Sequence, residues 1–195
     1  MATKLAELLI IEKKIEKKIS LPKPITWEHF KNRYLSREDE FTYEWVNGYV
    51  EKTKREFGYR HLYIFKNLTD TFINFNCQQK GSLTKDIATF FLADYLQPDI
   101  SFFTKEQIRT TNRNEYQTPK FVIEIISNND KAKKLQGKMV DYLRADVLVI
   151  WQIYPDLQVV HVYNGNKMTL LMNDDLCSAA PVLPEFVISV NDIFK

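Results

Sequence analysis

Hydrophobic and polar positions repeat along the chain with periods that predict both helices and strands. Apolar residues recur every three or four positions over residues 3–19 and 58–76, which is the period of an amphipathic helix. Thr26 can cap a further short helix through residue 35. Asn129 or Asp130 can cap another helix that runs to about residue 144. Strands are predicted for residues 41–46, 49–53, 83–91, 99–103, 121–126, 147–153, 157–163 and 168–172.

The segments between these elements define the predicted architecture. Asn47-Gly48 joins the first two strands and is the strongest short hairpin signal. Residues 121–126 are almost wholly apolar, which is typical of a central strand covered on both faces. The polar, basic segment 105–118 is interpreted as a loop. The sum is an α/β domain, a mixed central sheet flanked by helices, over residues 25–195. Prolines at 22 and 24 end the first helix, so residues 1–24 are expected to form an N-terminal helical extension.

Composition excludes several other classes of protein. Of the 195 residues, 45% are hydrophobic and 27% are charged, which is a globular mixture and not a disordered one. No window approaches the roughly 20 uncharged apolar residues of a membrane span, and residues 1–20 lack the apolar core of a secretion signal. We therefore expect a cytoplasmic protein without a membrane partner. Cys77 and Cys177 have no metal-ligand spacing and are expected to be buried thiols.

Three acids occur inside or beside apolar strands. Glu124 interrupts the run 121–126, where a buried carboxylate is costly unless it is paired or binds a metal. The alternative is an edge strand that turns Glu124 to water. Asp99 follows Pro98, a pair that more often marks a turn, and Glu44 alone would more often face solvent. Together the three acids supply the hard oxygen ligands that magnesium or manganese prefers.

The helix after Glu124 supplies basic side chains. Its lysines are Lys131, Lys133, Lys134 and Lys138. A run of charge on a helix is usually a solvated face. Lys138, however, lies about two turns beyond the helix start, roughly 12 Å along the axis, where a helix that folds back could aim it at the site. A lysine beside carboxylates and a metal can stabilise charge on a phosphoryl transition state. Lys134 shares a face with Lys138 and is its rival for this role.

Basic residues also concentrate outside this helix. The formal net charge is only +2, but residues 52–66 contain five basic residues and one acid. Charge of this kind can neutralise the phosphates of a nucleic acid. The stretch 172–195 is acidic instead. The positive charge is therefore placed near the middle of the chain, where the candidate site residues lie.

A series of short motifs follows in order along the chain. They are Tyr43-Glu44, Asn47-Gly48, His61, Pro98-Asp99, Val122-Ile123-Glu124-Ile125-Ile126-Ser127, Lys138 with Tyr142, Val147 with Trp151, and Leu183-Pro184-Glu185-Phe186. Each motif is weak alone. Their order and spacing resemble the Uma-type restriction endonuclease family of the PD-(D/E)XK nuclease superfamily, and the resemblance extends from about residue 25 to residue 194.

The resemblance implies a restriction-endonuclease-like fold, a divalent cation (Mg²⁺ or Mn²⁺) and a role for each motif. Asp99 and Glu124 would ligate the metal, and Glu44 would be the early acid that supports the metal or water. Lys138 would complete the catalytic set, because Ile126 occupies the position of the superfamily lysine. His61 matches a family histidine that either contacts substrate, as Lys134 would, or only packs. The chain departs from the family at two positions: Asp146 stands where the family usually has glycine, and Tyr154 where it commonly has an acid. Neither position belongs to the proposed site.

Three functions remain open at this point. The first is a metal-dependent endonuclease that hydrolyses phosphodiester bonds in DNA. The second is a non-catalytic module on the same fold that binds nucleic acid or a protein partner, because a fold does not establish activity. The third is a hydrolase of small phosphate esters, although no Gly-rich phosphate loop favours it. Leu5, Leu8, Ile11, Ile15 and Ile19 form an apolar stripe, which is expected to pack either on a second subunit, as a homodimer, or on its own domain.

Overall fold

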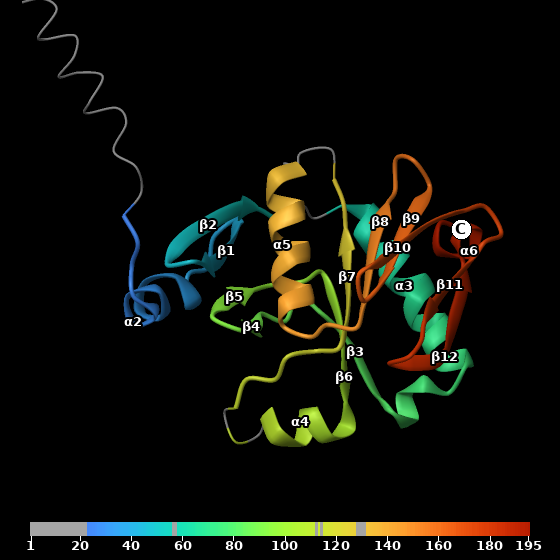
Figure 1. Cartoon of the computed structure of the whole chain (residues 1–195), viewed down its shortest axis with the longest axis horizontal. Coiled ribbons are helices and arrows are strands. Elements are labelled where there is room, and N and C mark those ends of the chain that lie inside the picture. Colours follow the sequence, from blue (N-terminus) through green and yellow to red (C-terminus); the bar gives the residue numbers. More distant parts are fainter. Residues whose placement is uncertain (1–22, 56–57, 112, 114, 128–131) are drawn as a thin grey trace, which may run out of the picture.

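The computed structural model describes residues 23–55, 58–111, 113, 115–127 and 132–195 of the chain (Figure 1). The predicted helix over residues 3–19 and the predicted caps at Asn129 and Asp130 lie outside these residues. The described residues fold into an α/β architecture with one six-stranded sheet, one four-stranded sheet and one two-stranded hairpin. Within them, no helix has both the length and the hydropathy of a membrane span.

The six-stranded sheet contains the central strand that the sequence predicts. Its strands are β3 (Gly81–Lys85), β6 (Ile100–Thr104), β7 (Phe121–Ile125), β8 (Val149–Tyr154), β9 (Val159–Asn164) and β10 (Lys167–Met172). They follow the order β10-β9-β8-β7-β6-β3, and only β7 and β8 are parallel among the paired neighbours. All five residues of β7 are buried. The central strand is therefore confirmed, and the alternative of an edge strand at Glu124 is wrong.

The four-stranded sheet carries the predicted hairpin. Its strands are β1 (Phe41–Val46), β2 (Tyr49–Lys54), β4 (Thr89–Phe91) and β5 (Asp94–Leu96), in the order β2-β1-β5-β4. Asn47 and Gly48 have φ of 50° and 82°, and positive φ at both central residues is what a tight two-residue hairpin requires. The helix α2 (Trp27–Phe30) and the π-helical turn η1 (Lys31–Leu35) follow the N-cap Thr26, as predicted. They pack aromatic rings against this sheet.

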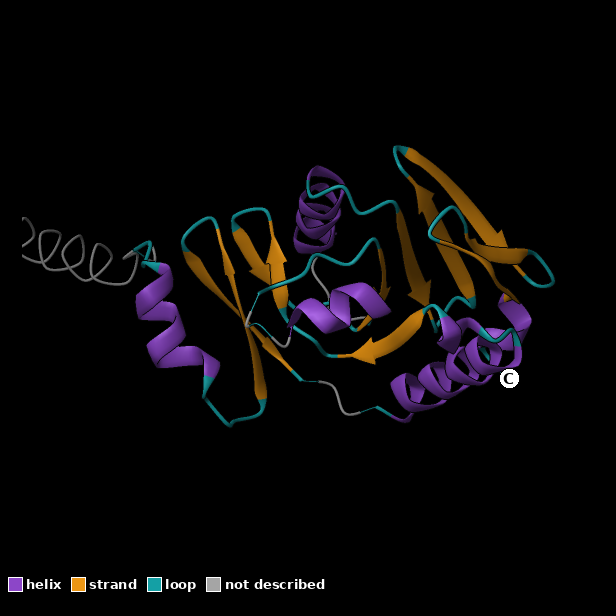
Figure 2. Cartoon of the chain, turned by 90° about the horizontal axis from the view of Figure 1, so that it is seen from below, coloured by secondary structure: helices purple, strands orange, loops and turns teal. Residues whose placement is uncertain are grey.

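Helices cover both faces of the six-stranded sheet (Figure 2). On one face, α3 (Tyr59–Asn74) buries Ile64, Leu68 and Phe72, which lie one turn apart. The 3₁₀ turn η2 (Cys77–Gln79), the hairpin β11 (Leu176–Ala179) with β12 (Leu183–Ser189) and helix α6 (Val190–Ile193) complete this layer. On the other face, α5 (Ala132–Arg144) packs Met139 and Tyr142 into a second cluster. These layers place α5 over the strand that carries Glu124.

Two predictions about local structure are wrong. Residues 83–91 form two strands in different sheets, because the chain leaves β3 at Asp86, whose φ is 56°. The predicted loop over 105–118 begins with helix α4 (Lys105–Thr111), which buries none of its residues and so has no apolar stripe to reveal it. The hairpin β11–β12 was not predicted. The two cysteines, in contrast, are buried and free, as expected.

Candidate active site

Three parts of the fold direct polar side chains into one cavity of about 960 Å³. Glu44 comes from β1 of the four-stranded sheet, whereas Glu124 comes from β7 of the six-stranded sheet. Asp99 precedes β6, and Lys138 comes from α5. All four line the cavity. The structure therefore brings together the four residues that the sequence selected from positions far apart in the chain.

Asp99 and Glu124 form the acidic floor of this cavity. The register Ile100↔Ile123 between β6 and β7 carries Asp99 towards Glu124, and Oδ2 of Asp99 accepts a hydrogen bond from the backbone N–H of Ile125 at 2.6 Å. Burial, together with the nearby charge of Glu124, raises the pKa of Asp99 to about 8. Burial also raises the pKa of Glu124, although Lys138 opposes that shift. Two carboxyl groups are thus held close together in a site that disfavours their full ionisation.

Lys138 lies between two carboxylates. Its Nζ is 2.9 Å from Oε1 of Glu44 and 3.1 Å from Oε1 of Glu124, and it also donates to the backbone carbonyl of Gln97 at 3.3 Å. Burial disfavours the ammonium, but the charges of Glu124 and Glu44 outweigh burial and raise the pKa of Lys138 well above its ordinary value. The hydroxyl of Tyr142, one turn further along α5, donates to the same Oε1 of Glu124. Lys138 is therefore a fixed positive charge.

Glu44 is almost fully buried, with 2% of its surface exposed. Its Oε1 accepts a hydrogen bond from the backbone N–H of Gln97 at 2.9 Å, and its Oε2 lies 3.0 Å from Nζ of Lys134. Burial would raise the pKa of Glu44, but Lys138 and Lys134 outweigh burial and lower it. Lys134 also reaches Glu51 at 3.5 Å. Lys134 and Lys138, the two candidates for the catalytic lysine, therefore both contact Glu44, and of the two only Lys138 also contacts Glu124.

Asp99 and Glu124 could hold a divalent cation whose other ligands come from outside the protein. Within the described residues, Oδ1 of Asp99 and Oε2 of Glu124 accept no hydrogen bond, and each is a hard oxygen donor. Burial and the charge of Glu124 raise the pKa of Asp99, and a cation between the two carboxylates would relieve their repulsion. In the described part of the chain, no three His, Cys, Asp or Glu side chains are grouped to hold a metal. Magnesium commonly binds through one or two carboxylates and completes its shell with water and phosphate.

Four basic side chains that line the cavity are exposed, and together they are called the basic border. They are Lys52, Lys54, Arg55 and Lys85. His61, in the first turn of α3, is half-buried and also lines the cavity. Its contact with substrate remains a prediction. Lys133 is exposed and does not line the cavity, and Lys131 lies outside the described residues.

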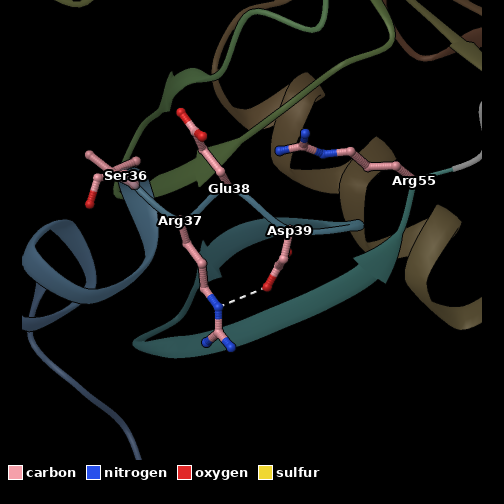
Figure 3. Close-up of a pocket in the computed structure, with 6 residues that line it drawn as sticks. Ser36, Arg37, Glu38, Asp39 and Arg55 are labelled. Carbon is pink, nitrogen blue, oxygen red and sulfur yellow. Dashed lines mark ion pairs between the residues drawn. The ribbon is translucent and has the colours of Figure 1, made fainter.

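A second hollow of about 460 Å³ adjoins the first, because Arg55 lines both. Figure 3 shows that it lies between the segment before β1 and Arg55, which follows β2. Its charges balance one another, since Arg37 pairs with Asp39 at 2.8 Å. Glu38 is its other acid, and both Glu38 and the partly exposed Asp39 lie near the surface. It has no buried carboxyl pair, so the chemistry belongs to the larger cavity.

Sequence reasoning missed several residues that complete the site. Gln97 contributes both of its backbone polar groups, one to Glu44 and the other to Lys138. Backbone contacts leave no signature in residue type. Tyr142 was noted only as part of a motif, but its position four residues after Lys138 places both on one helix face. Thr53 accepts a hydrogen bond from Lys134 at 2.5 Å. Alternation along β2 could have placed Thr53 with Glu51 on one face of the strand.

Comparison with known proteins identifies the family and the fold. The Uma2 family, described as "Putative restriction endonuclease", matches residues 27–191. Among curated proteins, none matches the chain. The fold is similar to the crystal structure of "a putative nuclease belonging to DUF820" from Anabaena variabilis, with a TM-score of 0.74 and 23% sequence identity. That similarity covers 88% of this chain and 98% of the other. With its restriction-endonuclease-like fold and the motifs of its cavity, the chain belongs to the Uma2 family.

Proposed function

We propose that the protein is a metal-dependent endonuclease that hydrolyses phosphodiester bonds in DNA. The observation that carries the proposal is the placement of Asp99, Glu124 and Lys138 in one cavity with an exposed basic border. The carboxylates suit a divalent cation, and the border suits a polyanion. Membership of the Uma2 family supports the same activity.

Asp99, Glu124, Lys138 and Tyr142 have distinct parts in this proposal. Asp99 and Glu124 would hold Mg²⁺ or Mn²⁺, which supplies Lewis acidity and lowers the pKa of water. Lys138 stays protonated at neutral pH, because its pKa is raised well above the ordinary value. It therefore acts as a positive charge beside the scissile phosphate and not as a base. Tyr142 holds Glu124 through Oε1 and leaves its Oε2 for the cation.

The basic border would bind the phosphates that flank the scissile bond. The side chains of this border, Lys52, Lys54, Arg55 and Lys85, are exposed and line the cavity. Contacts of this kind release counterions, so binding should weaken as salt is added. They read charge and not base sequence, and they serve DNA and RNA alike. The proposal of DNA as substrate is therefore tested directly against RNA.

The test is cleavage of a supercoiled plasmid with Mg²⁺ or Mn²⁺, compared with the same reaction in chelator. We expect nicked and linear products only with the metal, and their loss in Asp99→Ala and Glu124→Ala. Both variants should also bind Mg²⁺ much more weakly in calorimetry. Equal Mg²⁺ binding by the wild type and both variants would remove the metal site from the proposal.

The same experiment separates the alternative functions. Salt-dependent binding of DNA without cleavage in either metal would favour the non-catalytic module. Cleavage of RNA alone would change the substrate. Hydrolysis of p-nitrophenyl phosphate without cleavage of either polymer would favour a small-ester hydrolase, although a cavity with an exposed basic border fits a polymer better.

We also propose that two copies act together, because a nuclease that cuts both strands commonly needs two sites. The proposal rests on the apolar stripe that the sequence predicts over residues 3–19. Light scattering should give a dimer, and removal of residues 1–20 should weaken it. A monomeric full-length chain whose stability is unchanged by the truncation would refute this assembly.

A further inference from the structure

Glu44 enters the cavity from a different sheet than Asp99 and Glu124. Its carboxylate is 2% exposed and is bound on both oxygens. Oε1 contacts the backbone N–H of Gln97 and Nζ of Lys138, each at 2.9 Å, whereas Oε2 contacts Nζ of Lys134 at 3.0 Å. A carboxylate has about four lone-pair sites, and three of those on Glu44 are used by groups of this chain.

The two lysines that Glu44 binds lie one turn apart on α5, so their side chains leave the same helix face. A lysine side chain is long and flexible, and fixing it in one conformation costs roughly 2 kcal/mol of rotamer entropy. Glu44 supplies a partner for each ammonium and thereby offsets that loss. For Lys138, the carbonyl of Gln97 and the carboxylate of Glu124 add two further acceptors, at 3.3 Å and 3.1 Å. The ammonium is thus held from three directions.

A metal-binding role for Glu44 conflicts with these contacts. A cation bound to either oxygen would have to displace an ammonium or lie against it, and like charges at such distances repel. The described residues also contain no group of three acids that could share one ion. Asp99 and Glu124, in contrast, each keep an oxygen that no described donor occupies. The contacts therefore divide the three acids into two that each keep one oxygen for a cation and one, Glu44, whose two oxygens are both bound.

We infer that Glu44 is a positioning residue, which fixes the ammonium of Lys138 beside Glu124 and does not ligate the metal. The inference rests on the proposed function for its catalytic consequence, but the contacts that carry it are independent of activity. Lys134 and its second partner Glu51 support the same arrangement from the exposed side, where the side chain of Glu51 is 37% exposed. Glu44 is the shared partner of both lysines.

The experiment compares Glu44→Gln with Glu51→Gln in the full chain. Glutamine keeps the size of Glu44 and an acceptor for Gln97 but removes the charge that holds the lysines. Nuclear magnetic resonance of ¹⁵N-labelled lysine ammonium groups detects only ammonium groups that are held firmly enough to exchange protons slowly. We expect Glu44→Gln to abolish or shift the Lys138 and Lys134 signals. Glu51→Gln, the matched control, should affect the signal of Lys134 alone.

Metal binding and kinetics supply the other measurements. In Glu44→Gln, the calorimetric Kd for Mg²⁺ should stay within about threefold, whereas Asp99→Ala should weaken it by at least about tenfold, or 1.4 kcal/mol. Turnover of plasmid should fall by up to about a hundredfold, the scale of a misplaced catalytic group, with little change in KM. Glu44→Asp keeps the charge and should recover part of both the Lys138 signal and kcat.

Two results would overturn the inference. A loss of Mg²⁺ affinity in Glu44→Gln as large as that in Asp99→Ala would make Glu44 a ligand. An unchanged Lys138 signal would show that Glu44 does not hold it. If Glu44→Gln does not fold, Glu44→Asp carries the same measurements, because its shorter side chain should shift the Lys138 signal without weakening Mg²⁺ binding. If the protein cleaves neither DNA nor RNA, only the proposed function is refuted, because the resonance and calorimetric measurements of Glu44 need no turnover.

Discussion

Replacement of Asp99 by asparagine should stabilise the metal-free protein at neutral and alkaline pH. Asparagine has nearly the shape of the protonated acid, and its carbonyl can accept the hydrogen bond from Ile125 that Asp99 now accepts. In the unfolded chain Asp99 ionises near its ordinary pKa of 3.8, whereas in the folded chain its pKa is about 8. Between these values the unfolded state releases a proton that the folded state keeps. Rising pH therefore favours unfolding.

The size of the effect follows from the gap between the pH and the ordinary pKa of Asp99. At pH 7 this gap is about three units, which at 1.36 kcal/mol per unit corresponds to about 4 kcal/mol. Asp99 is partly exposed, so solvent reduces the effect, and we expect about 2 kcal/mol. For a chain of this length that is a rise in Tm of roughly 4–8 °C. At pH 5 the gap shrinks to about one unit, and the difference should fall below about 1 kcal/mol.

Thermal unfolding in chelator at pH 5, 7 and 8 measures the difference. The matched control is Asp86→Asn, which changes an exposed acid of the same cavity. Its φ of 56° suits asparagine as well as aspartate, so its Tm should change little. Mg²⁺ should then stabilise the wild type but not Asp99→Asn. A difference in Tm between the wild type and Asp99→Asn that is the same at pH 5 and pH 8 would refute the reasoning.

Three further predictions concern metal binding, the two lysines and packing. Because Asp99 holds a proton below pH 8, Mg²⁺ binding at pH 7 should release protons, and the affinity for Mg²⁺ should rise with pH until about 8. Calorimetry in buffers of different ionisation enthalpy measures the release, and an affinity independent of pH would contradict this prediction. Lys138→Ala should lower the cleavage rate by roughly a hundredfold in single-turnover assays. Lys134→Ala should mainly weaken DNA binding and reduce the dependence of the binding constant on salt by up to about one unit of slope. The reverse pattern would assign the catalytic charge to Lys134. Gly81→Ala should unfold or strongly destabilise the protein, since a Cβ there would lie 2.0 Å from the carbonyl oxygen of Phe103. A Cβ at Gly137, in contrast, meets no atom within 4 Å, so Gly137→Ala should stabilise α5 by about 1 kcal/mol in chemical denaturation.

The sequence predicted those parts of the fold whose signal is local. The apolar run around Glu124 became a buried central strand, and the stripe through Ile64, Leu68 and Phe72 became a helix on its face. Asn47-Gly48 became a tight turn with positive φ at both residues. In each case one short segment contains the whole pattern, so no knowledge of its neighbours is needed.

One failure arose where a single backbone angle redirects the chain, and the other where a local signal was overlooked. Residues 83–91 read as one strand, because nothing in the side chains reveals that Asp86 turns the chain from one sheet to another. Helix α4 lacks buried residues, but it does carry a reciprocal cap, in which Thr104 and Gln107 each accept a hydrogen bond from the backbone N–H of the other. A threonine followed three residues later by glutamine is a recognised helix start. That signal was present in the sequence.

In the candidate site, the identities of the residues could be predicted from the sequence but their contacts could not. The identities of Glu44, Asp99, Glu124 and Lys138 could be selected from acids in apolar strands and from the order of motifs, and the structure places all four in one cavity. Their mutual contacts could not be predicted, because the pairing of Glu44 with two lysines requires β1 to lie against α5. Sequence therefore indicates which groups take part, whereas only the fold assigns their partners.

The alternation of β1 also determines which changes in length the protein can accept. Along this strand Tyr43 and Trp45 join the aromatic cluster beneath α2, and Glu44 between them faces the lysines. Insertion of one residue before Glu44 would exchange these two faces and turn the carboxylate of Glu44 away from the two ammonium groups. The turn at Gly165 faces open space, so added residues there would extend into solvent. Among natural variants of this chain, gaps and insertions should therefore gather at the β9–β10 turn and avoid β1.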